Sequence, residues 1–313
     1  MRYKGAGAQK IVYRALVRRS VRSYAEGVRG TVSESLPAGG AVASAALEQG
    51  AALLRGRRVL VLGGAGVSTE SGIPDYRGPD RKNPPTPMRF QQFVGSEAAR
   101  RRYWARSFVG WARVAEARPN AGHRALAQLE AAGRLGGLIT QNVDGLHQAA
   151  GSRGVLELHG SLAAVRCLSC GALSSRRLLQ AQLRALNPLA QTAAAVLAPD
   201  GDAELTSDME AHFVVPACSR CGGVLKPDVV FFGENVPKPR VARAYGLLER
   251  ADALLVVGSS LTVFSGYRFV VAAVTAGKPV VIFNRGETRG DKDATFKLEG
   301  RLGEVLPALC ELL

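Results

Sequence analysis

The feature that most constrains the fold of this chain is a series of short apolar runs separated by helical stretches. Helical periodicity fills residues 97–117, 120–132, 238–250 and 264–276, and a further helix is expected from Ala41 to about Leu54. The apolar runs lie at 58–62, 137–140, 155–158, 254–258 and 280–283. Strands that alternate with helices favour a mostly parallel sheet with right-handed crossovers. The chain is therefore predicted to be an α/β protein with a doubly wound, Rossmann-like parallel sheet.

The composition agrees with this α/β prediction. Of the 313 residues, 47% are hydrophobic and only 6% are aromatic, which suits an Ala/Val/Leu-rich α/β core better than an all-β one. No apolar run reaches the ~20 residues that a membrane-spanning helix needs. We therefore expect a soluble protein with no membrane partner.

The amino-terminal residues 1–40 are basic and lack a dense core pattern. Residues 1–31 contain eight Lys or Arg and one acid, Glu26, which gives 8 − 1 = +7 of the total net charge of +15. An Arg-rich, acid-poor, mildly amphipathic leader is typical of a mitochondrial transit peptide, which predicts the mitochondrial matrix. The alternative is a disordered basic arm without a targeting role. Residues 33–40 are expected to form a loop or linker because of their Ser, Pro and Gly content.

A glycine-containing loop, Gly64-Ala65-Gly66-Val67-Ser68, follows the first apolar run directly. Bare backbone at this place lets a pyrophosphate approach closely, and the amino terminus of a following helix would attract its charge. The spacing departs from G-x-G-x-x-G because Thr69 occupies the position of the third glycine and the next glycine is Gly72. A tight strand-to-helix turn is therefore the alternative. The polar, Pro-rich segment from Ser71 onward is long enough to cover a ligand.

Polar residues or glycines follow each of the later runs as well. They are Gln141, Asn142 and Asp144, with Val143 between them, after the second run, His159 and Gly160 after the third, Ser259 and Ser260 after the fourth, and Asn284, Arg285 and Gly286 after the fifth. The carboxyl ends of parallel strands meet at one edge, so these residues predict a binding crevice. His159 stands directly after a strand and is the candidate general base. His123, His147 and His212 are interpreted as structural residues.

Two C-x-x-C pairs, Cys167/Cys170 and Cys218/Cys221, predict a metal site. Each pair is followed by glycine, which allows the tight turn that a metal knuckle requires. Four thiolates complete a tetrahedral Zn²⁺ site and leave no open position, so the zinc would be structural. A redox dithiol is the lesser alternative, and Cys310 is interpreted as a buried thiol. The strand–helix pattern breaks down over residues 161–224, which we expect to form a smaller inserted zinc-binding module.

Taken in order, these motifs resemble the sirtuin (Sir2) family over about residues 45–313. The matching segments are 64–68 with 71–77, Thr140 to His147, Leu158-His159-Gly160, the two cysteine pairs, 258–260 and 284–286. The closer likeness is to class II, the branch that contains mitochondrial sirtuin four and its bacterial relatives, because of segments 103–111, 197–202 and 226–234. The short Pro-rich loop 78–90 is nearer to bacterial members, and a bacterial cytoplasm is the alternative location.

The resemblance implies NAD⁺-dependent deacylation of protein lysines, with NAD and zinc as cofactors. Nicotinamide would leave, the acyl-lysine oxygen would attack the ribose carbon, and His159 would take a proton from a ribose hydroxyl. The products would be lysine, nicotinamide and O-acyl-ADP-ribose. Asn142 and Asp144 would contact the nicotinamide carboxamide and count with His159 as catalytic. The expected NAD contacts are Gly64, Ala65, Gly66, Ser68, Gly72, Ile73, Pro74, Asp75, Tyr76, Arg77, Gln141, Asn142, Val143, Asp144, Gly258, Ser259, Ser260, Asn284, Arg285, Gly286 and Leu302.

The acyl-lysine protein substrate is expected to add as a strand between two segments. One contains Val230, Phe231, Phe232, Gly233 and Glu234, and the other follows Ser260. Tyr103 and Arg106 have a Y-x-x-R spacing that resembles the acid-acyl selector of desuccinylating sirtuins, and the arginine could pair with an acyl carboxylate. A solvated arginine beside a core aromatic residue is the alternative.

Two other functions stay open from the sequence alone. One is a protein mono-ADP-ribosyltransferase that uses the same crevice. The other is a zinc-ribbon nucleic-acid binder, which the net charge of +15 suggests. Aromatic residues for base stacking are missing near the cysteine pairs, so no specific nucleic-acid partner is expected.

The expected catalytic domain spans residues 41–313. Its large, Rossmann-like part would comprise residues 41–160 and 225–313, and its small zinc-binding part would comprise residues 161–224.

Overall fold

The computed structural model describes residues 33–35, 40–78, 87–192 and 207–313. Its main sheet has seven parallel strands in the order β1-β10-β9-β8-β2-β3-β4. Their bounds are β1 Ser33–Ser35, β2 Val59–Gly63, β3 Leu135–Thr140, β4 Val155–Glu157, β8 Ala253–Val257, β9 Val280–Phe283 and β10 Phe296–Glu299. The predicted Rossmann-like sheet is confirmed, and β2 lies at the point where the strand order reverses.

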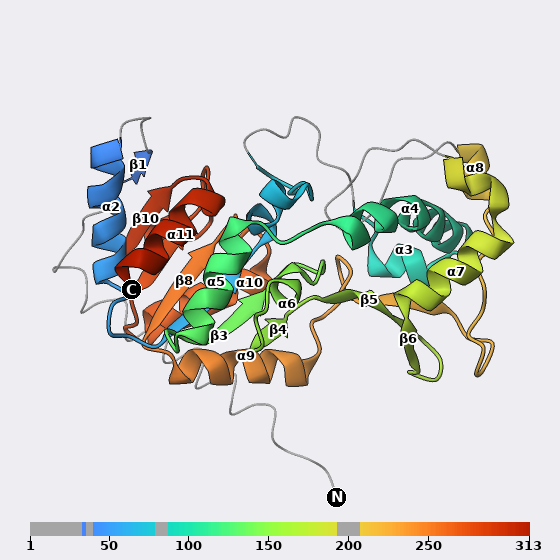
Figure 1. The fold of residues 1–313 in the computed structure, drawn as a ribbon. Coiled ribbons are helices and arrows are strands. Elements are labelled where there is room, and N and C mark those ends of the chain that lie inside the picture. The colour runs from blue at the N-terminus through green and yellow to red at the C-terminus, as the bar shows by residue number, and fades with distance from the viewer. Residues whose placement is uncertain (1–32, 36–39, 79–86, 193–206) are drawn as a thin grey trace, which may run out of the picture.

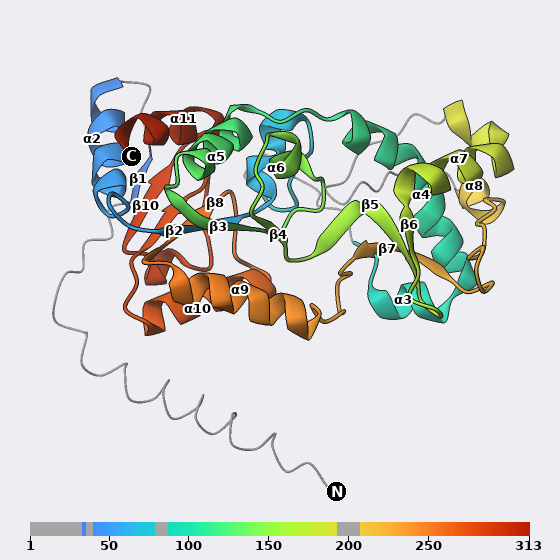
Figure 2. The same cartoon turned by 60° about the horizontal axis from the view of Figure 1, so that its bottom comes forward.

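Helices cover both faces of this sheet, as Figures 1 and 2 show. On one face lie α2 (Gly40–Ala52), α5 (Ala121–Ala131) and α11 (Leu302–Leu312), and on the other lie α9 (Lys238–Arg250) and α10 (Phe264–Thr275). Along β2, Val59 and Val61 join the first core while Leu60 and Leu62 join the second. Because successive side chains point to opposite faces, a strand that is buried on both sides must be apolar throughout.

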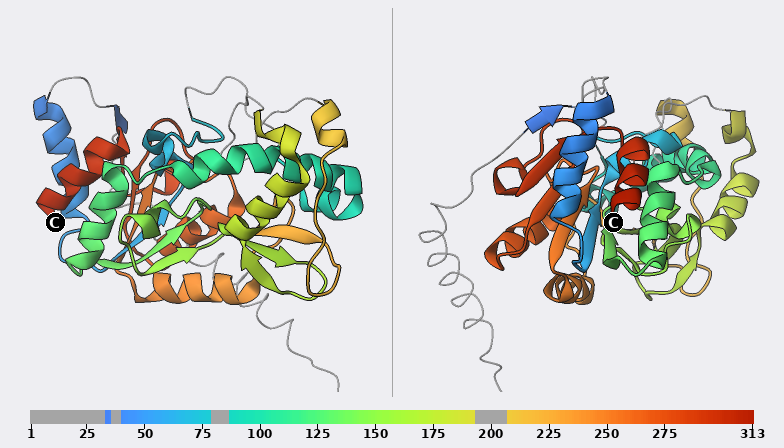
Figure 3. Two further views of the ribbon diagram at one scale, coloured as in Figure 1. Left: turned by 45° about the vertical axis from the view of Figure 1, so that its right-hand side comes forward. Right: turned by 60° about the vertical axis from the view of Figure 1, so that its left-hand side comes forward.

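A second, three-stranded antiparallel sheet has the order β6-β5-β7. Its strands are β5 (Gly160–Cys167), β6 (Leu173–Ser175) and β7 (Leu225–Val229). Helices α3 (Phe90–Gly95), α4 (Glu97–Glu116) and α7 (Arg176–Leu186) share a core with it. This smaller part lies at the end of the molecule away from α2 (Figure 3). Packing therefore groups α3, α4 and β7 with the segment 161–224, although they lie outside it in sequence.

The structure differs from expectation in two strands. Residues 33–35 were expected in a loop or linker, but they pair as β1 with β10. Strand β10 follows a loop and has the mixed sequence Phe-Lys-Leu-Glu, so it offers no apolar run. The rest of the leader, residues 1–32 and 36–39, lies outside the described residues, and so does the transit peptide that was predicted there.

The remaining short elements lie in the connections between these helices and strands. They are η1 Ala65–Val67, η2 Thr69–Ser71, α6 Leu146–Ala149, η3 Pro188–Thr192, α8 Ser207–Ala211 and η4 Asp291–Asp293. Within the described ranges, no helix combines the length and the apolar character that crossing a bilayer requires.

Candidate active site and metal centre

A cavity of about 470 Å³ lies at the carboxyl edge of the parallel sheet, between the two parts of the molecule. Residues that follow β2, β3, β4, β8 and β9 line it, so the expected crevice is present. The predicted NAD contacts on its wall are Gly64, Ala65, Gly66, Ser68, Ile73, Pro74, Asp75, Tyr76, Arg77, Gln141, Asn142, Val143, Asp144, Gly258, Ser259, Ser260, Asn284, Arg285 and Gly286. His159, Val230, Phe231 and Phe232 line the same cavity.

The loop after β2 lies against Gly258 at the end of β8. The backbone N–H of Gly66 donates to the carbonyl oxygen of Gly258 at 2.8 Å. A Cβ atom on Gly64 would lie 2.6 Å from that same oxygen, so the close approach requires glycine. The expected helix amino terminus is absent here, because the loop continues as two one-turn 3₁₀ helices, η1 and η2. A tight turn, rather than the amino terminus of a long helix, therefore lines the cavity at this place.

An amide, a hydroxyl and a carboxylate form one hydrogen-bonded cluster on the cavity wall. The Asn142 side chain donates to the carbonyl oxygen of Gly64 and to Oγ of Ser68, each at 3.0 Å. Ser68 in turn donates to Oδ2 of Asp144 at 2.7 Å. Burial raises the pKa of the Asp144 carboxyl, while the hydrogen bonds from the Leu146 backbone and from Ser68 oppose that shift. The cluster holds both predicted nicotinamide contacts in fixed orientations.

His159 has a hydrogen bond at each ring nitrogen. Its Nδ1 lies 2.9 Å from the backbone carbonyl oxygen of Gln141, which can only accept, so Nδ1 carries the proton. Its Nε2 therefore has the free lone pair, and Oγ of Ser265 donates to it at 2.8 Å. Burial lowers the pKa of the imidazole, and the charges of Arg240 and Arg268 lower it further against the opposing Gln141 bond. The ring is neutral and can accept a proton at Nε2.

Five of the predicted NAD or substrate contacts do not line the cavity. They are Gly72, Tyr103, Arg106, Gly233 and Leu302. Leu302 packs behind the wall, because its Cδ1 would lie 2.9 Å from a Cβ on Gly258. Gly72 ends η2 in the left-handed conformation, and the carbonyl of Gly233 accepts from Gln91.

The expected acid-acyl selector is not in the cavity. Tyr103 is buried in an aromatic cluster with Phe93 and Phe231. Arg106 pairs its Nε with a carboxylate oxygen of Glu210 at 2.5 Å. The i, i+3 spacing contains no information about which neighbours these two side chains meet, and neither side chain lines the cavity.

Several lining residues were not expected from the sequence. They are Gly78, Met88, Val229 and Glu287, whereas Leu261, Thr262 and Val263 belong to the segment after Ser260 that was expected beside the substrate. Leu261 has a positive φ of 55°, unusual for a non-glycine residue. Its backbone N–H donates to Oγ of Ser259, which helps to hold this turn. Leu261 to Val263 could be expected at the cavity because they directly follow Gly258-Ser259-Ser260 in the sequence.

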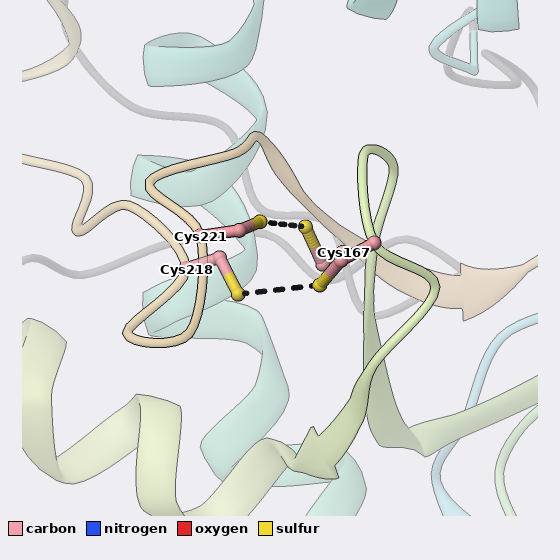
Figure 4. A group of neighbouring side chains, drawn as sticks. Cys167, Cys218 and Cys221 are labelled. Atoms are coloured by element: carbon pink, nitrogen blue, oxygen red, sulfur yellow. Dashed lines mark hydrogen bonds between the residues drawn. The ribbon is translucent and has the colours of Figure 1, made fainter.

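The four cysteines of the two C-x-x-C pairs meet at the tip of the smaller sheet (Figure 4). The Sγ atoms of Cys167 and Cys221 are 3.5 Å apart, and those of Cys170 and Cys218 are 3.9 Å apart. Zn–S bonds of ~2.3 Å in a tetrahedron place the sulfurs ~3.8 Å apart, so this donor set fits a zinc ion.

The backbone around the cysteines has the tight turns that a metal-binding knuckle requires. In each pair the glycine after the second cysteine, Gly171 or Gly222, is left-handed and donates its N–H to the carbonyl of the first cysteine. Backbone N–H groups of Cys170 and Ser169 lower the pKa of the Cys167 thiol to about 6. They favour the thiolate, which is the form that ligates a metal.

Comparison with known proteins gives consistent results. Residues 64–265 match the model of the Sir2 family. The chain is 54% identical over 267 residues to NAD-dependent protein deacetylase 1 of Mycobacterium avium, covering 84% of this chain and 94% of that protein. It is 57% identical over 261 residues to NAD-dependent protein deacetylase 1 of Streptomyces coelicolor, covering 83% and 87%.

Comparison with solved structures also finds similarity to Sir2 proteins. A Sir2 structure with a p53 peptide and NAD⁺ has a TM-score of 0.65 and 32% identity, covering 83% of this chain and 95% of that one. A Sir2Tm structure bound to a propionylated peptide has a TM-score of 0.66 and 29% identity, covering 85% and 97%.

Proposed function

Because the chain belongs to the Sir2 family, we propose that it is an NAD⁺-dependent protein-lysine deacylase that releases nicotinamide and O-acyl-ADP-ribose. One observation supports this proposal above the others. A neutral imidazole with an unprotonated Nε2 lines the same cavity as the Asn142–Ser68–Asp144 cluster and the glycine loop after β2. The relatives named as deacetylases support it as well.

The cavity residues suit the parts of NAD⁺. The bare backbone of Gly64 and Gly66 would hold the phosphates, and Asn142 with Asp144 would face the carboxamide of nicotinamide. The Asn284 side chain donates to the carbonyls of Arg285 and Gly286, which shapes the turn that would hold the adenosine ribose. Bound NAD⁺ would supply a ribose carbon that accepts the acyl oxygen when nicotinamide leaves.

The chain's own residues would orient the reactants and move one proton. The hydrogen bonds of the Asn142–Ser68–Asp144 cluster fix the side chains that would meet the carboxamide before NAD⁺ binds, which reduces the entropy lost on binding. His159 would take a proton from a ribose hydroxyl at Nε2, while the Gln141 carbonyl keeps Nδ1 protonated. The low pKa of His159 keeps the ring neutral, and therefore basic, at physiological pH.

The segment after β7 offers a place for the substrate backbone. Residues 230–232 line the cavity, and the carbonyl of Phe232 accepts from the N–H of Phe90 on one side. We propose that an acyl-lysine peptide adds as a strand between this segment and Leu261 to Val263. The cysteine cluster would hold a structural zinc, and residues 161–224 with α3 and α4 would form the zinc-binding module.

The preferred acyl group and the location are finer parts of the proposal. Tyr103 and Arg106 do not line the cavity, and Arg106 pairs with Glu210, so we propose a short neutral acyl group such as acetyl. The relatives reported above are bacterial, which supports a bacterial cytoplasm and gives the mitochondrial matrix no support. We also propose assignment to class II, on the segments that resemble that branch.

The test is mass spectrometry of an acyl-lysine peptide panel with and without NAD⁺. Acetyl-lysine peptides should be deacylated with stoichiometric nicotinamide and O-acetyl-ADP-ribose, and His159→Ala should abolish the product. If ADP-ribose from adenine-labelled NAD⁺ stays on protein without peptide deacylation, the mono-ADP-ribosyltransferase replaces the proposal. Salt-sensitive duplex binding without NAD⁺ turnover would instead favour the nucleic-acid binder.

A further inference from the structure

The hydroxyl of Ser265 is hydrogen-bonded to Nε2 of His159, the nitrogen that would accept the proton. Its Oγ lies 2.8 Å from Nε2 of His159. Because Nδ1 of the same ring donates to the Gln141 carbonyl, Nε2 has no proton to give, and Ser265 must be the donor. Ser265 is the second residue of α10 and lies outside the strand-end motifs that form the rest of the site.

The close approach of α10 to Gln141 depends on Gly266, the residue after Ser265. A Cβ atom on Gly266 would lie 2.4 Å from Oε1 of Gln141. The Gln141 amide cannot move aside freely, because its Nε2 donates to Oγ of Ser259 at 2.8 Å. Glycine at this position therefore lets α10 pack against Gln141, the residue whose carbonyl holds the other nitrogen of His159.

The helix that holds Ser265 is rigidly packed. Its buried face consists of Gly266, Tyr267, Phe269, Val270 and Ala273, and it covers the sheet face formed by residues such as Leu60 and Leu62. Ser265 lies in the first turn, where the helix dipole is positive, which disfavours an imidazolium beside it. A hydroxyl on such a support can fix the orientation of the ring without needing side-chain reorganisation.

We propose that Ser265 is a positioning residue for the deacylation proposed above. It holds the imidazole of His159 in one orientation, with Nε2 unprotonated, until a ribose hydroxyl replaces it as the donor. No proton passes to or from Ser265 in this exchange. The ribose O–H bond breaks, the proton forms a bond to Nε2, and Ser265 keeps its own proton throughout. The inference rests on the proposed function, because it assigns Nε2 as the proton acceptor.

The kinetic test compares three variants of the full zinc-loaded chain: Ser265→Ala, Ser265→Thr and, as a matched control, Ser174→Ala in the exposed strand β6. Deacetylation kinetics and exchange of labelled nicotinamide into NAD⁺ are measured for each. Exchange reports the step before the base acts. We expect Ser265→Ala to lower kcat about 5- to 20-fold with KM for NAD⁺ and the exchange rate within about 2-fold of wild type.

The threonine variant keeps the hydroxyl and should restore at least about half of the wild-type kcat, and Ser174→Ala should match wild type. A wild-type kcat for Ser265→Ala overturns the proposal. Equal losses of exchange and deacetylation in Ser265→Ala also overturn it, because they indicate general damage to the site.

A spectroscopic test separates failure of this inference from failure of the proposed function. The chain contains four histidines, so ¹⁵N-histidine labelling gives few ring signals, and His159→Ala assigns those of His159. Loss of the Ser265 hydroxyl should shift the Nε2 signal of His159 and leave its Nδ1 protonated. An unmoved Nε2 signal would refute the hydrogen bond. Absence of NAD⁺-dependent turnover in wild type, with the Nε2 shift present, would instead refute the proposed function.

Discussion

The ring of His147 packs edge-on against the ring of His123, with the ring centroids 4.8 Å apart. Both side chains are almost fully buried, and neither nitrogen of His147 has a hydrogen-bond partner among the described residues. Burial lowers the pKa of His147 to about 3 and that of His123 to about 4. Two uncharged imidazoles therefore lie directly behind the Ser68–Asp144 cluster, since Oγ of Ser68 is 3.5 Å from Nε2 of His123.

This pair predicts a loss of stability in mild acid. The unfolded chain binds protons at these histidines below about pH 6.5, whereas the folded chain does so only near pH 4 and pH 3. Stability is therefore complete above pH 6.5 and falls as the pH drops through the window from 6.5 to 3. Each group should cost about 2 kcal/mol of unfolding free energy at pH 5. Urea unfolding at pH 7.5 and pH 5 measures the loss.

Variants isolate the contribution of the pair from that of other acidic groups. His147→Phe keeps an aromatic ring at this position and removes the titration, so its stability should depend less steeply on pH than that of wild type. His212→Gln, at an exposed position, is the matched control and should keep the wild-type slope. Equal slopes for His147→Phe and wild type would contradict the prediction.

The glycine contact between the loop and β8 predicts a strong substitution effect. In Gly64→Ala the new methyl group would meet the Gly258 carbonyl at 2.6 Å, and neither backbone can move without disturbing the sheet. We expect a loss of about 1–3 kcal/mol of unfolding free energy together with a higher KM for NAD⁺. Gly95→Ala, which meets no atom within 4 Å, should leave both quantities unchanged. An alanine at position 64 that is stable and active would contradict the close approach.

The cysteine cluster predicts one structural metal ion. Purified protein should contain about one zinc ion per chain, and a strong chelator should remove it and lower Tm. Cys218→Ser should bind zinc weakly and melt at a lower temperature, whereas Cys310→Ser should retain the metal, because Cys310 lies apart from the cluster and its thiol donates to the carbonyl of Ala125. A chain that is free of zinc and has an unchanged Tm would rule out this role.

Much of the fold was predictable because buried parallel strands must be apolar on both faces. The runs at β2, β8 and β9 have every residue buried, so their sequences identify them. Strand β10 includes Lys297, whose ammonium pairs with Asp291 and Glu299. A charged residue inside a strand conceals it from an argument based on apolar runs.

The site was predictable to the extent that it follows from strand ends. Parallel strands bring their carboxyl ends together whatever the details of packing, so Asn142, His159 and Ser259 could be grouped from sequence. Ser265 and the Arg106–Glu210 pair depend on how helices α10, α4 and α8 pack. Local spacing contains no information about such contacts between distant segments, and Tyr103 and Arg106, expected from their spacing to select the acyl group, do not line the cavity.

The last prediction concerns the acid limb of the pH–rate profile. The charge of Arg268 lowers the pKa of His159, and Nε of Arg268 is buried without a hydrogen-bond partner among the described residues. Arg268→Met keeps most of the side-chain length and removes the charge, so the pKa of His159 should rise. Because the base is active when it is unprotonated, the pH of half-maximal kcat/KM on the acid side should move upward, and the rate above about pH 8 should change little. Arg243→Met, at an exposed position of α9, is the matched control. A profile for Arg268→Met that overlays that of wild type, or one displaced toward lower pH, would show that this arginine does not tune the base.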